Sequence, residues 1–250
     1  KARHRRVLCF SQYGGDLNKY CPALLPDIPI KNTIGDVLAK NGLTQLRLAE
    51  TEKYNHVTYF MDSERTIDFP GEKKILVASP AVATFDLAPD MAAPEITREF
   101  LRNIAHFDAV IMNYANGDMV GHTGDMAATI KSLESLDFCL SKIVPAVLKL
   151  GGAIMITADH GNAEKMSDWR GRKWTAHTTN PVPFILVSNS SLLRKDSRAR
   201  FPFAGEGVSP EGRRGSGIKL RRRGTLANIA ATMLKLLGLR APREMQPPLF

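Results

Sequence analysis

Short apolar runs alternate with longer amphipathic stretches along most of the chain, and this alternation restricts the fold more than any other feature. Residues 108–113 and 153–157 have the length and aliphatic content of strands that are buried on both faces. Helical spacing precedes the first run at 93–105, and a longer helical stretch joins the two from about 125 to 150. Alternating strands and helices predict an α/β fold, a mostly parallel sheet sandwiched by helices.

Further segments extend this pattern in both directions. Strands are predicted at 45–49, 56–60, 74–78 and 182–187, and helices at 33–40 and between Thr225 and Gly238. Pro145 lies inside the long helix and is expected to kink or split it. Because such folds bind ligands beyond the carboxyl ends of their strands, we expect a functional site in the segments that follow 108–113 and 153–157.

Those two segments carry a concentration of aspartate and histidine. Asp118 and His122 follow the first strand, the adjacent Asp159 and His160 follow the second, and His177 lies in a polar loop before the last strand. Half of the six histidines in the chain fall in these three places. A single Asp-x-x-x-His or Asp-His pair is weak evidence for a metal, but the whole set at strand ends predicts a two-metal site.

The mixture of ligand types limits the choice of metal. Carboxylates balance the charge of two closely spaced divalent ions, and imidazoles favour manganese or zinc over calcium. Asp118 and His122 are four residues apart, which suits either one face of a helix or the two ends of a tight loop; Gly117 and Gly121 favour the loop. Side chains of consecutive residues diverge in an extended chain, so Asp159 and His160 can face different ions, or one ion and the substrate.

Composition places the chain among soluble globular proteins. It is 44% hydrophobic and 24% charged over 250 residues, and it contains no apolar run near the roughly 20 residues that span a bilayer. We therefore expect no membrane partner. Three scattered cysteines without metal-binding spacing favour free thiols in a reducing compartment.

Positive charge is concentrated in one segment. Residues 194–223 contain ten lysines or arginines against three acids, among many glycines, serines and prolines. Such a basic insertion is either a solvated loop or a docking segment for RNA or another acidic partner, because clustered arginine gains affinity by releasing counterions from phosphates.

Several segments resemble cofactor-independent phosphoglycerate mutase, a family of the alkaline phosphatase superfamily. The resemblance is carried by NYANGDMVGHTG at 113–124, TADHGNAE at 157–164 and AHTTNPVP at 176–183, with further matches in LRLAETEKY at 46–54 and VATFDL at 82–87. It extends from about residue 7 to the C-terminus and is interrupted by the basic insertion. It implies an alkaline phosphatase-like fold.

The resemblance also implies an activity and its residues. Members of this family interconvert 3-phosphoglycerate and 2-phosphoglycerate through a phosphoserine and use two manganese ions, or magnesium or cobalt in some relatives. By position, Asp118, His122 and His177 would hold one metal, and Asp159 with His160 would hold the other. Lys53 matches a family lysine beside the serine and the substrate phosphate, where its charge would stabilise the transferring phosphoryl group.

The family comparison further implies that this chain corresponds to the C-terminal, phosphatase-like portion only. Residues 1–30 would be the end of a transferase domain and a linker, and residues 31–250 would be the metal-binding domain with the basic insertion. We find no segment resembling the family's serine-bearing stretch, so the nucleophilic serine is absent from this chain. A sheet without that strand exposes an edge and an apolar surface, which implies a second polypeptide or missing segment that completes it.

Three functions compete at this stage. The first is the metal-binding portion of a phosphoglycerate mutase, inactive alone, with phosphoglycerate as substrate. The second is a truncated, non-catalytic relative that serves as a structural subunit of a larger, RNA-containing assembly. The third is a metal-dependent phosphatase or sulfatase. The family implies a cytoplasmic enzyme; the arginine-rich start at 1–6 also fits the remainder of a targeting segment, which leaves a mitochondrial or other organelle matrix as the alternative.

Overall fold

The structure is a computed structural model that describes residues 7–12, 15–25, 30–189, 220–221 and 223–250. Its main body is built around a three-stranded parallel sheet with the order β2-β1-β3. The central strand β1 (Gln45–Glu50) pairs with β2 (Glu72–Val77) on one side and with β3 (Ala109–Met112) on the other. Every residue of β1 is buried, as expected for a strand that is paired on both edges and covered on both faces.

A second, two-stranded sheet lies beside the first. Its strands β4 (Ala153–Thr157) and β5 (Phe184–Ser188) are antiparallel. The sequence correctly places strands in both segments, but β5 does not extend the parallel sheet. The predicted full burial of 108–113 and 153–157 is also wrong, because most residues of β3 and β4 are half-buried.

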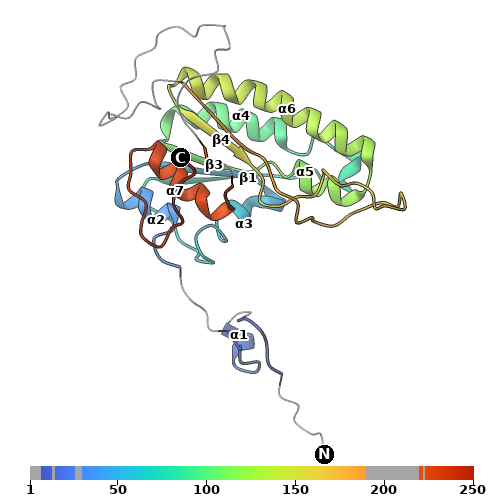
Figure 1. Cartoon of the computed structure of the whole chain (residues 1–250), viewed down its shortest axis with the longest axis horizontal. Coiled ribbons are helices and arrows are strands. Elements are labelled where there is room, and N and C mark those ends of the chain that lie inside the picture. The colour runs from blue at the N-terminus through green and yellow to red at the C-terminus, as the bar shows by residue number, and fades with distance from the viewer. Residues whose placement is uncertain (1–6, 13–14, 26–29, 190–219, 222) are drawn as a thin grey trace, which may run out of the picture.

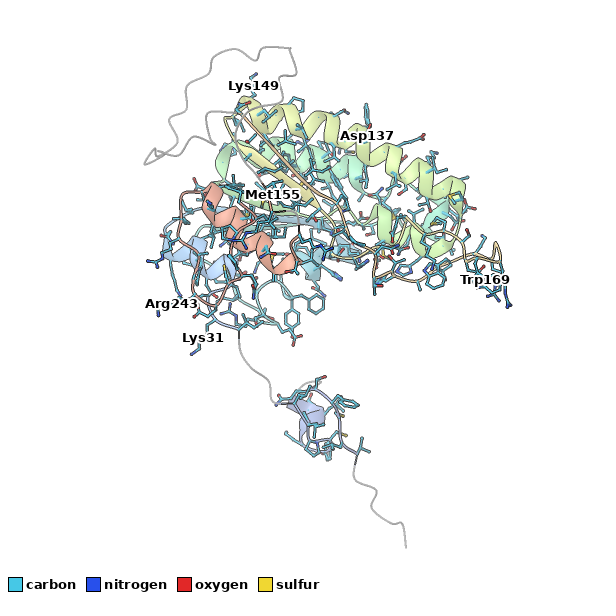
Figure 2. All side chains as sticks on the ribbon, in the orientation of Figure 1. Lys31, Asp137, Lys149, Met155, Trp169 and Arg243 are labelled. Atoms are coloured by element: carbon cyan, nitrogen blue, oxygen red, sulfur yellow. The ribbon has the colours of Figure 1, made fainter. Side chains whose placement is uncertain are left out.

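Helices cover both faces of the parallel sheet, which confirms the predicted fold class (Figure 1). On one face, Leu46 and Leu48 pack against α4 (Ala93–Asn103) and α6 (Met126–Lys149). On the other face, Ala109 packs with α2 (Ile34–Lys40) and α7 (Ile229–Leu236). The outer side of α6 faces solvent, as Asp137 shows in Figure 2.

Side-chain caps mark the start of α2 and α6 and of the short turn before α7. Thr33 forms a capping box with Asp36 at α2, and Thr225 forms one with Asn228 in the short 3-10 helix that leads into α7. Asp125 accepts a hydrogen bond from the backbone of Ala128 at the start of α6. The α6 helix continues through Pro145, so the proline does not split it.

The remaining helices are short, and two of them, α3 and α5, follow β1 and β3 at the candidate site. They are α1 (Gly15–Asn18), α3 (Tyr54–Val57) and α5 (Asn116–Met119), with 3-10 turns at Thr51–Lys53, Phe85–Leu87, Ile104–His106, Gly121–Thr123 and Leu226–Asn228. The strand predicted at 56–60 is therefore wrong, since that segment is the end of α3 and a turn. The loop predicted for Asp118 to His122 is also wrong, since the segment consists of two helical turns.

The described residues 7–12 and 15–25, with α1, stand apart from the main body in Figure 1. The proposed boundary at residue 30 stays a prediction. Most of the basic insertion at 194–223 lies outside the described residues, so the predicted RNA or acidic partner also stays a prediction. Cys139 is buried, whereas Cys9 and Cys21 are half-buried. Among the described helices, none is long and apolar enough to cross a membrane.

Candidate metal centre

Four segments converge at the carboxyl ends of the strands. Lys53 lies in the turn after β1, and α5 and the following 3-10 turn carry Asp118 and His122 after β3. Asp159 and His160 follow β4 directly, while His177 lies in the loop that leads to β5. The structure therefore brings all six predicted site residues to one edge of the fold.

Three of the predicted ligands meet at one point. Asp118 Oδ1 is 3.0 Å from His122 Nε2 and 3.0 Å from His177 Nε2. The two imidazole Nε2 atoms are also 3.0 Å apart. Atoms bound at about 2.1 Å to one divalent ion lie about 3 Å apart when their bonds are close to perpendicular. The donor set therefore fits a single divalent cation.

The protonation of His122 supports the same conclusion. Its Nδ1 is 2.7 Å from the carbonyl oxygen of Thr175, which can only accept a hydrogen bond, so Nδ1 carries the proton. With the proton on Nδ1, Nε2 is the nitrogen that faces Asp118 and His177 and is the one available to a metal ion. A histidine fixed in this tautomer by a backbone carbonyl is typical of metal sites.

Asp159 and His160 lie next to this trio. His160 Nε2 is 3.6 Å from Asp159 Oδ2 and 3.9 Å from Asp118 Oδ1, and its ring stacks on His177 with centroids 3.6 Å apart. Its Nδ1 is buried without a hydrogen-bond partner among the described residues. The pair provides two adjacent donors, fewer than a closed site needs, so its assignment to a second ion stays a prediction.

Lys53 supplies positive charge at the same place. Its side chain is buried, and Nζ lies 2.5 Å from Asp118 Oδ2. Burial alone would raise the pKa of Asp118, but hydrogen bonds from Lys53 and Asn162, together with the charge of Lys53, lower that pKa to about 2. Asp118 is therefore a carboxylate at neutral pH, which is the form that binds metal.

Two residues that the sequence did not single out connect these segments. Asn162 donates from Nδ2 to Asp118 Oδ1 over 2.8 Å, and Glu164 accepts hydrogen bonds from the side chains of Thr178 and Asn180. Both lie within the segment 157–164 that carries Asp159 and His160. The one sequence signal for a role in the site is that both residues are polar and closely follow Asp159-His160-Gly161. Their spacing in the sequence does not indicate what that role is.

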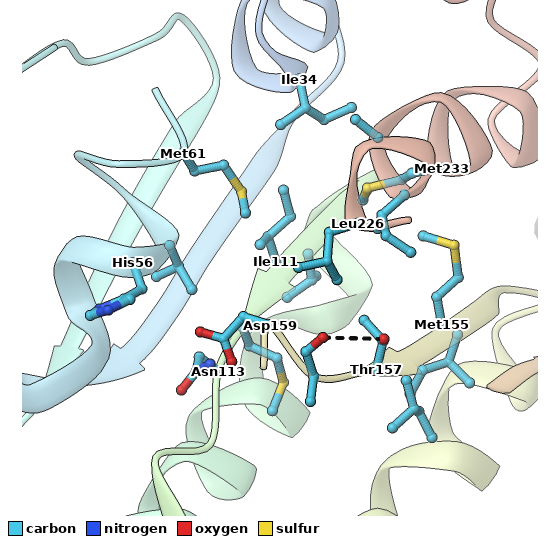
Figure 3. Close-up of a pocket in the computed structure, with 18 of the residues that line it drawn as sticks. Ile34, His56, Met61, Ile111, Asn113, Met155, Thr157, Asp159, Leu226 and Met233 are labelled. Carbon is cyan, nitrogen blue, oxygen red and sulfur yellow. Dashed lines mark hydrogen bonds between the residues drawn. The ribbon is translucent and has the colours of Figure 1, made fainter. Parts of the chain in front are cut away.

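A large cavity opens beside the candidate centre. It has a volume of about 1280 Å³ and is bounded by β3 on one side and β4 on the other. Figure 3 shows Ile111 of β3 and Met155 of β4 among its lining residues, together with Asp159. Leu136 and Leu140 of α6 also line the cavity. Lys53, Asp118 and His160 lie where the carboxyl ends of the strands reach the cavity.

Comparison with known proteins identifies the family. Residues 24–241 match the model of the metalloenzyme superfamily. The chain belongs to the metalloenzyme superfamily. Membership agrees with the geometry of Asp118, His122 and His177, whose donor atoms converge on one point.

Curated relatives of this chain are named 2,3-bisphosphoglycerate-independent phosphoglycerate mutase. One from a Cyanothece species is 48% identical over 238 residues, which cover 94% of this chain and 41% of the relative. Another, from Pseudomonas fluorescens, is 50% identical over 219 residues, which cover 86% of this chain and 38% of the relative. The chain thus spans about two fifths of the length of these relatives, and the resemblance seen in the sequence is confirmed.

A solved structure is similar over almost the whole chain. It is a phosphoglycerate mutase from Leishmania mexicana, crystallised at low cobalt concentration, with a TM-score of 0.75 and 30% sequence identity. The match covers 97% of this chain and 43% of that protein. The family model and this solved structure therefore support the fold and divalent-metal binding.

Proposed function

We propose that this chain is the metal-binding portion of a cytoplasmic phosphoglycerate mutase, which interconverts 3-phosphoglycerate and 2-phosphoglycerate through a phosphoserine. The observation that carries the proposal is the meeting of Asp118, His122 and His177 at one point, with the Lys53 ammonium against Asp118. Relatives named phosphoglycerate mutase that match most of the chain support the same activity.

Each residue of the candidate centre has a role in this proposal. Asp118, His122 and His177 would hold one divalent ion, and Asp159 with His160 would contribute to a second; manganese is proposed, with magnesium or cobalt as alternatives. When bound, such ions neutralise charge on the transferring phosphoryl group. Lys53 adds a fixed positive charge at the same edge, and the carbonyl of Thr175 keeps His122 in its ligating tautomer.

The nucleophilic serine would come from a second polypeptide or a segment beyond this chain. The cavity between β3 and β4 supports this part of the proposal, because each of these strands has one edge unpaired among the described residues. Both strands end at the candidate centre, so they run in the same direction. An added strand parallel to them would join the two sheets, bury the apolar lining and place the residue after it beside Asp159 and His160.

Complementation tests the proposal. The purified chain is mixed, in the presence of Mn²⁺, with the remaining portion of the Pseudomonas fluorescens relative, and mutase activity is followed through enolase. We expect activity in the mixture only, its loss in His122→Ala, and its retention in His106→Ala, an exposed histidine in a separate 3-10 turn. An inactive wild-type mixture, or full activity of His122→Ala, contradicts the proposal.

A further inference from the structure

Two side chains outside the candidate ligand set tie together the three segments that carry it. Asn162 donates from Nδ2 to Asp118 Oδ1 over 2.8 Å and to the Asp118 carbonyl oxygen over 3.2 Å. Glu164 contacts the segment that carries His177, because its Oε1 accepts hydrogen bonds from the Thr178 hydroxyl and from Asn180 Nδ2. We call Asn162 and Glu164 the loop clamp.

The two residues of the loop clamp also bind to each other. Glu164 Oε2 accepts a hydrogen bond of 2.6 Å from the backbone N–H of Asn162. A chain of contacts therefore runs from Asp118 through Asn162 and Glu164 to Thr178, the residue after His177. Glu164 is solvent-exposed, yet its carboxylate accepts three hydrogen bonds, which is more than a solvated surface glutamate requires.

Packing around the loop clamp leaves no space for a side chain at Gly161 or Gly121. Thr178 N–H donates to the Gly161 carbonyl over 2.8 Å, so these two segments form an antiparallel bridge. A Cβ on Gly161 would lie 2.2 Å from Thr178 Oγ1 and 2.4 Å from Glu164 Oε1. A Cβ on Gly121 would lie 2.6 Å from Asn162 Oδ1. Both glycines thus permit the close approach that the clamp maintains.

Burial distinguishes Asn162 from an ordinary loop residue. Its relative exposure is 4%, and its side chain turns toward the ligand cluster. By donating to Oδ1, the atom that also faces both Nε2 atoms, Asn162 fixes the rotation of the Asp118 carboxylate. Groups that orient metal ligands in this way influence affinity strongly although they do not touch the ion.

We propose that Asn162 and Glu164 are positioning residues: Asn162 sets the orientation of the Asp118 carboxylate, and Glu164 holds the His177 segment against the Asp159–His160 segment. Together they determine how tightly the centre binds a divalent cation. This inference rests on the proposed metal centre. It adds two residues whose substitution changes cation affinity without removing a ligand.

Calorimetric titration of the purified chain with Co²⁺ tests the loop clamp, and the visible spectrum of bound Co²⁺ reports the coordination geometry. We expect Asn162→Ala to weaken Co²⁺ binding about 10- to 100-fold, and Glu164→Ala about tenfold, each with an altered spectrum. Glu164→Gln keeps one acceptor oxygen for Thr178, so its affinity should lie between those of Glu164→Ala and the wild type. The control Glu134→Gln removes a charge from an exposed position of α6 and should bind like the wild type.

A second pair of variants tests the same contact without deleting a polar group. Gly121→Ala pushes against Asn162, whereas Gly117→Ala meets only Leu133 Cδ2 at 3.9 Å. The first should weaken Co²⁺ binding and the second should not. Thermal unfolding without metal separates positioning from folding, because a positioning role lowers affinity in variants whose metal-free melting temperature is unchanged.

The outcomes distinguish this inference from the proposed metal centre. If Asn162→Ala and Glu164→Ala bind Co²⁺ as tightly as the wild type while His122→Ala does not, the centre is correct and the clamp is refuted. Loss of affinity only in parallel with a lower metal-free melting temperature also refutes the clamp, since the residues would then act on folding. If the wild-type chain does not bind Co²⁺, the metal centre itself is refuted.

Discussion

At the scale of single residues, the buried arginine on β1 shows how strongly environment changes ionisation. Arg47 has 0% relative exposure and lies 3.5 Å from Asp62 Oδ1 and 3.2 Å from Glu72 Oε1. Asp62 Oδ1 is itself buried without a hydrogen bond from the described residues. Burial raises the pKa of Asp62 to about 6, although the charge of Arg47 opposes this shift.

Replacement of Asp62 by asparagine should change how stability depends on pH. Its carboxyl has a pKa of about 6 when folded and 3.8 in an unperturbed chain, so folding takes up a proton between these values. The contribution of Asp62 to the free energy of unfolding therefore falls as pH rises from about 4 to about 6, by up to about 3 kcal/mol, and is constant above. Asp62→Asn removes this fall, so its stability relative to the wild type should be greater at pH 7 than at pH 4.

Urea denaturation of both proteins at the two pH values measures the effect. Asp68→Asn is the matched control, because Asp68 is exposed, pairs with Lys74 and leaves Asp62 intact. It should retain the wild-type pH dependence. An equal stability difference between Asp62→Asn and wild type at pH 4 and pH 7 would show that burial does not raise the pKa of this carboxyl.

The sequence predicted some of these residues and missed others for a physical reason. Asp118, His122 and His177 were predicted because metal-ligand chemistry restricts residue type and their spacing places them at strand ends. Arg47 was not, because alternation with Leu46 and Leu48 gives no sign that a further layer covers its face. Asn162 and Glu164 make contacts that depend on how three distant segments meet, which local spacing does not specify.

At the scale of elements, the predictions succeeded where periodicity and caps agree. Residues 125–150 combine helical spacing with a capping aspartate, and the structure has α6 there. The strand prediction for residues 56–60 failed because their β-branched and aromatic composition is typical of strands. In the structure α3 ends there in a turn, in which the Thr58 hydroxyl donates a hydrogen bond to the Tyr54 carbonyl oxygen. Gly117 favours a loop in the sequence, but the structure accommodates it within α5.

Hydrogen exchange along β3 should reveal its unpaired edge. The amide of Ala109 donates to the carbonyl oxygen of Thr44, directly before β1, and that of Asn113 donates to Leu48 of β1. The amides of Val110 and Met112 alternate with these, so they point away from β1, toward the cavity that both residues line. We expect these two amides to exchange faster than those of Leu46 and Leu48 in the chain alone. Addition of the complementing polypeptide should slow them and leave β1 unchanged. Slow exchange at Val110 and Met112 without a partner would contradict an open edge.

At the scale of the whole molecule, the family resemblance predicts a missing strand but does not say where that strand would lie. The resemblance to a longer family implied a missing strand, and the structure contains a cavity of about 1280 Å³ between its two sheets. Periodicity identifies which segments are strands and says nothing about which strands are neighbours. The pairing of β4 with β5 and the cavity that β3 and β4 share are tertiary features, which the periodicity of single segments does not encode.

Metal binding should stabilise the whole chain, since a ligand that binds only the folded state shifts the unfolding equilibrium. Free Mn²⁺ at about 100 times its dissociation constant adds about 2.7 kcal/mol, which raises the melting temperature of a domain of this size by about 5–10 °C. Calorimetry of the wild type with Mn²⁺ and with EDTA measures the shift. His106→Ala should respond like the wild type, whereas His122→Ala should lose most of the response because one of the three converging donors is gone. An equal shift in His122→Ala would place the stabilising ion elsewhere on the molecule.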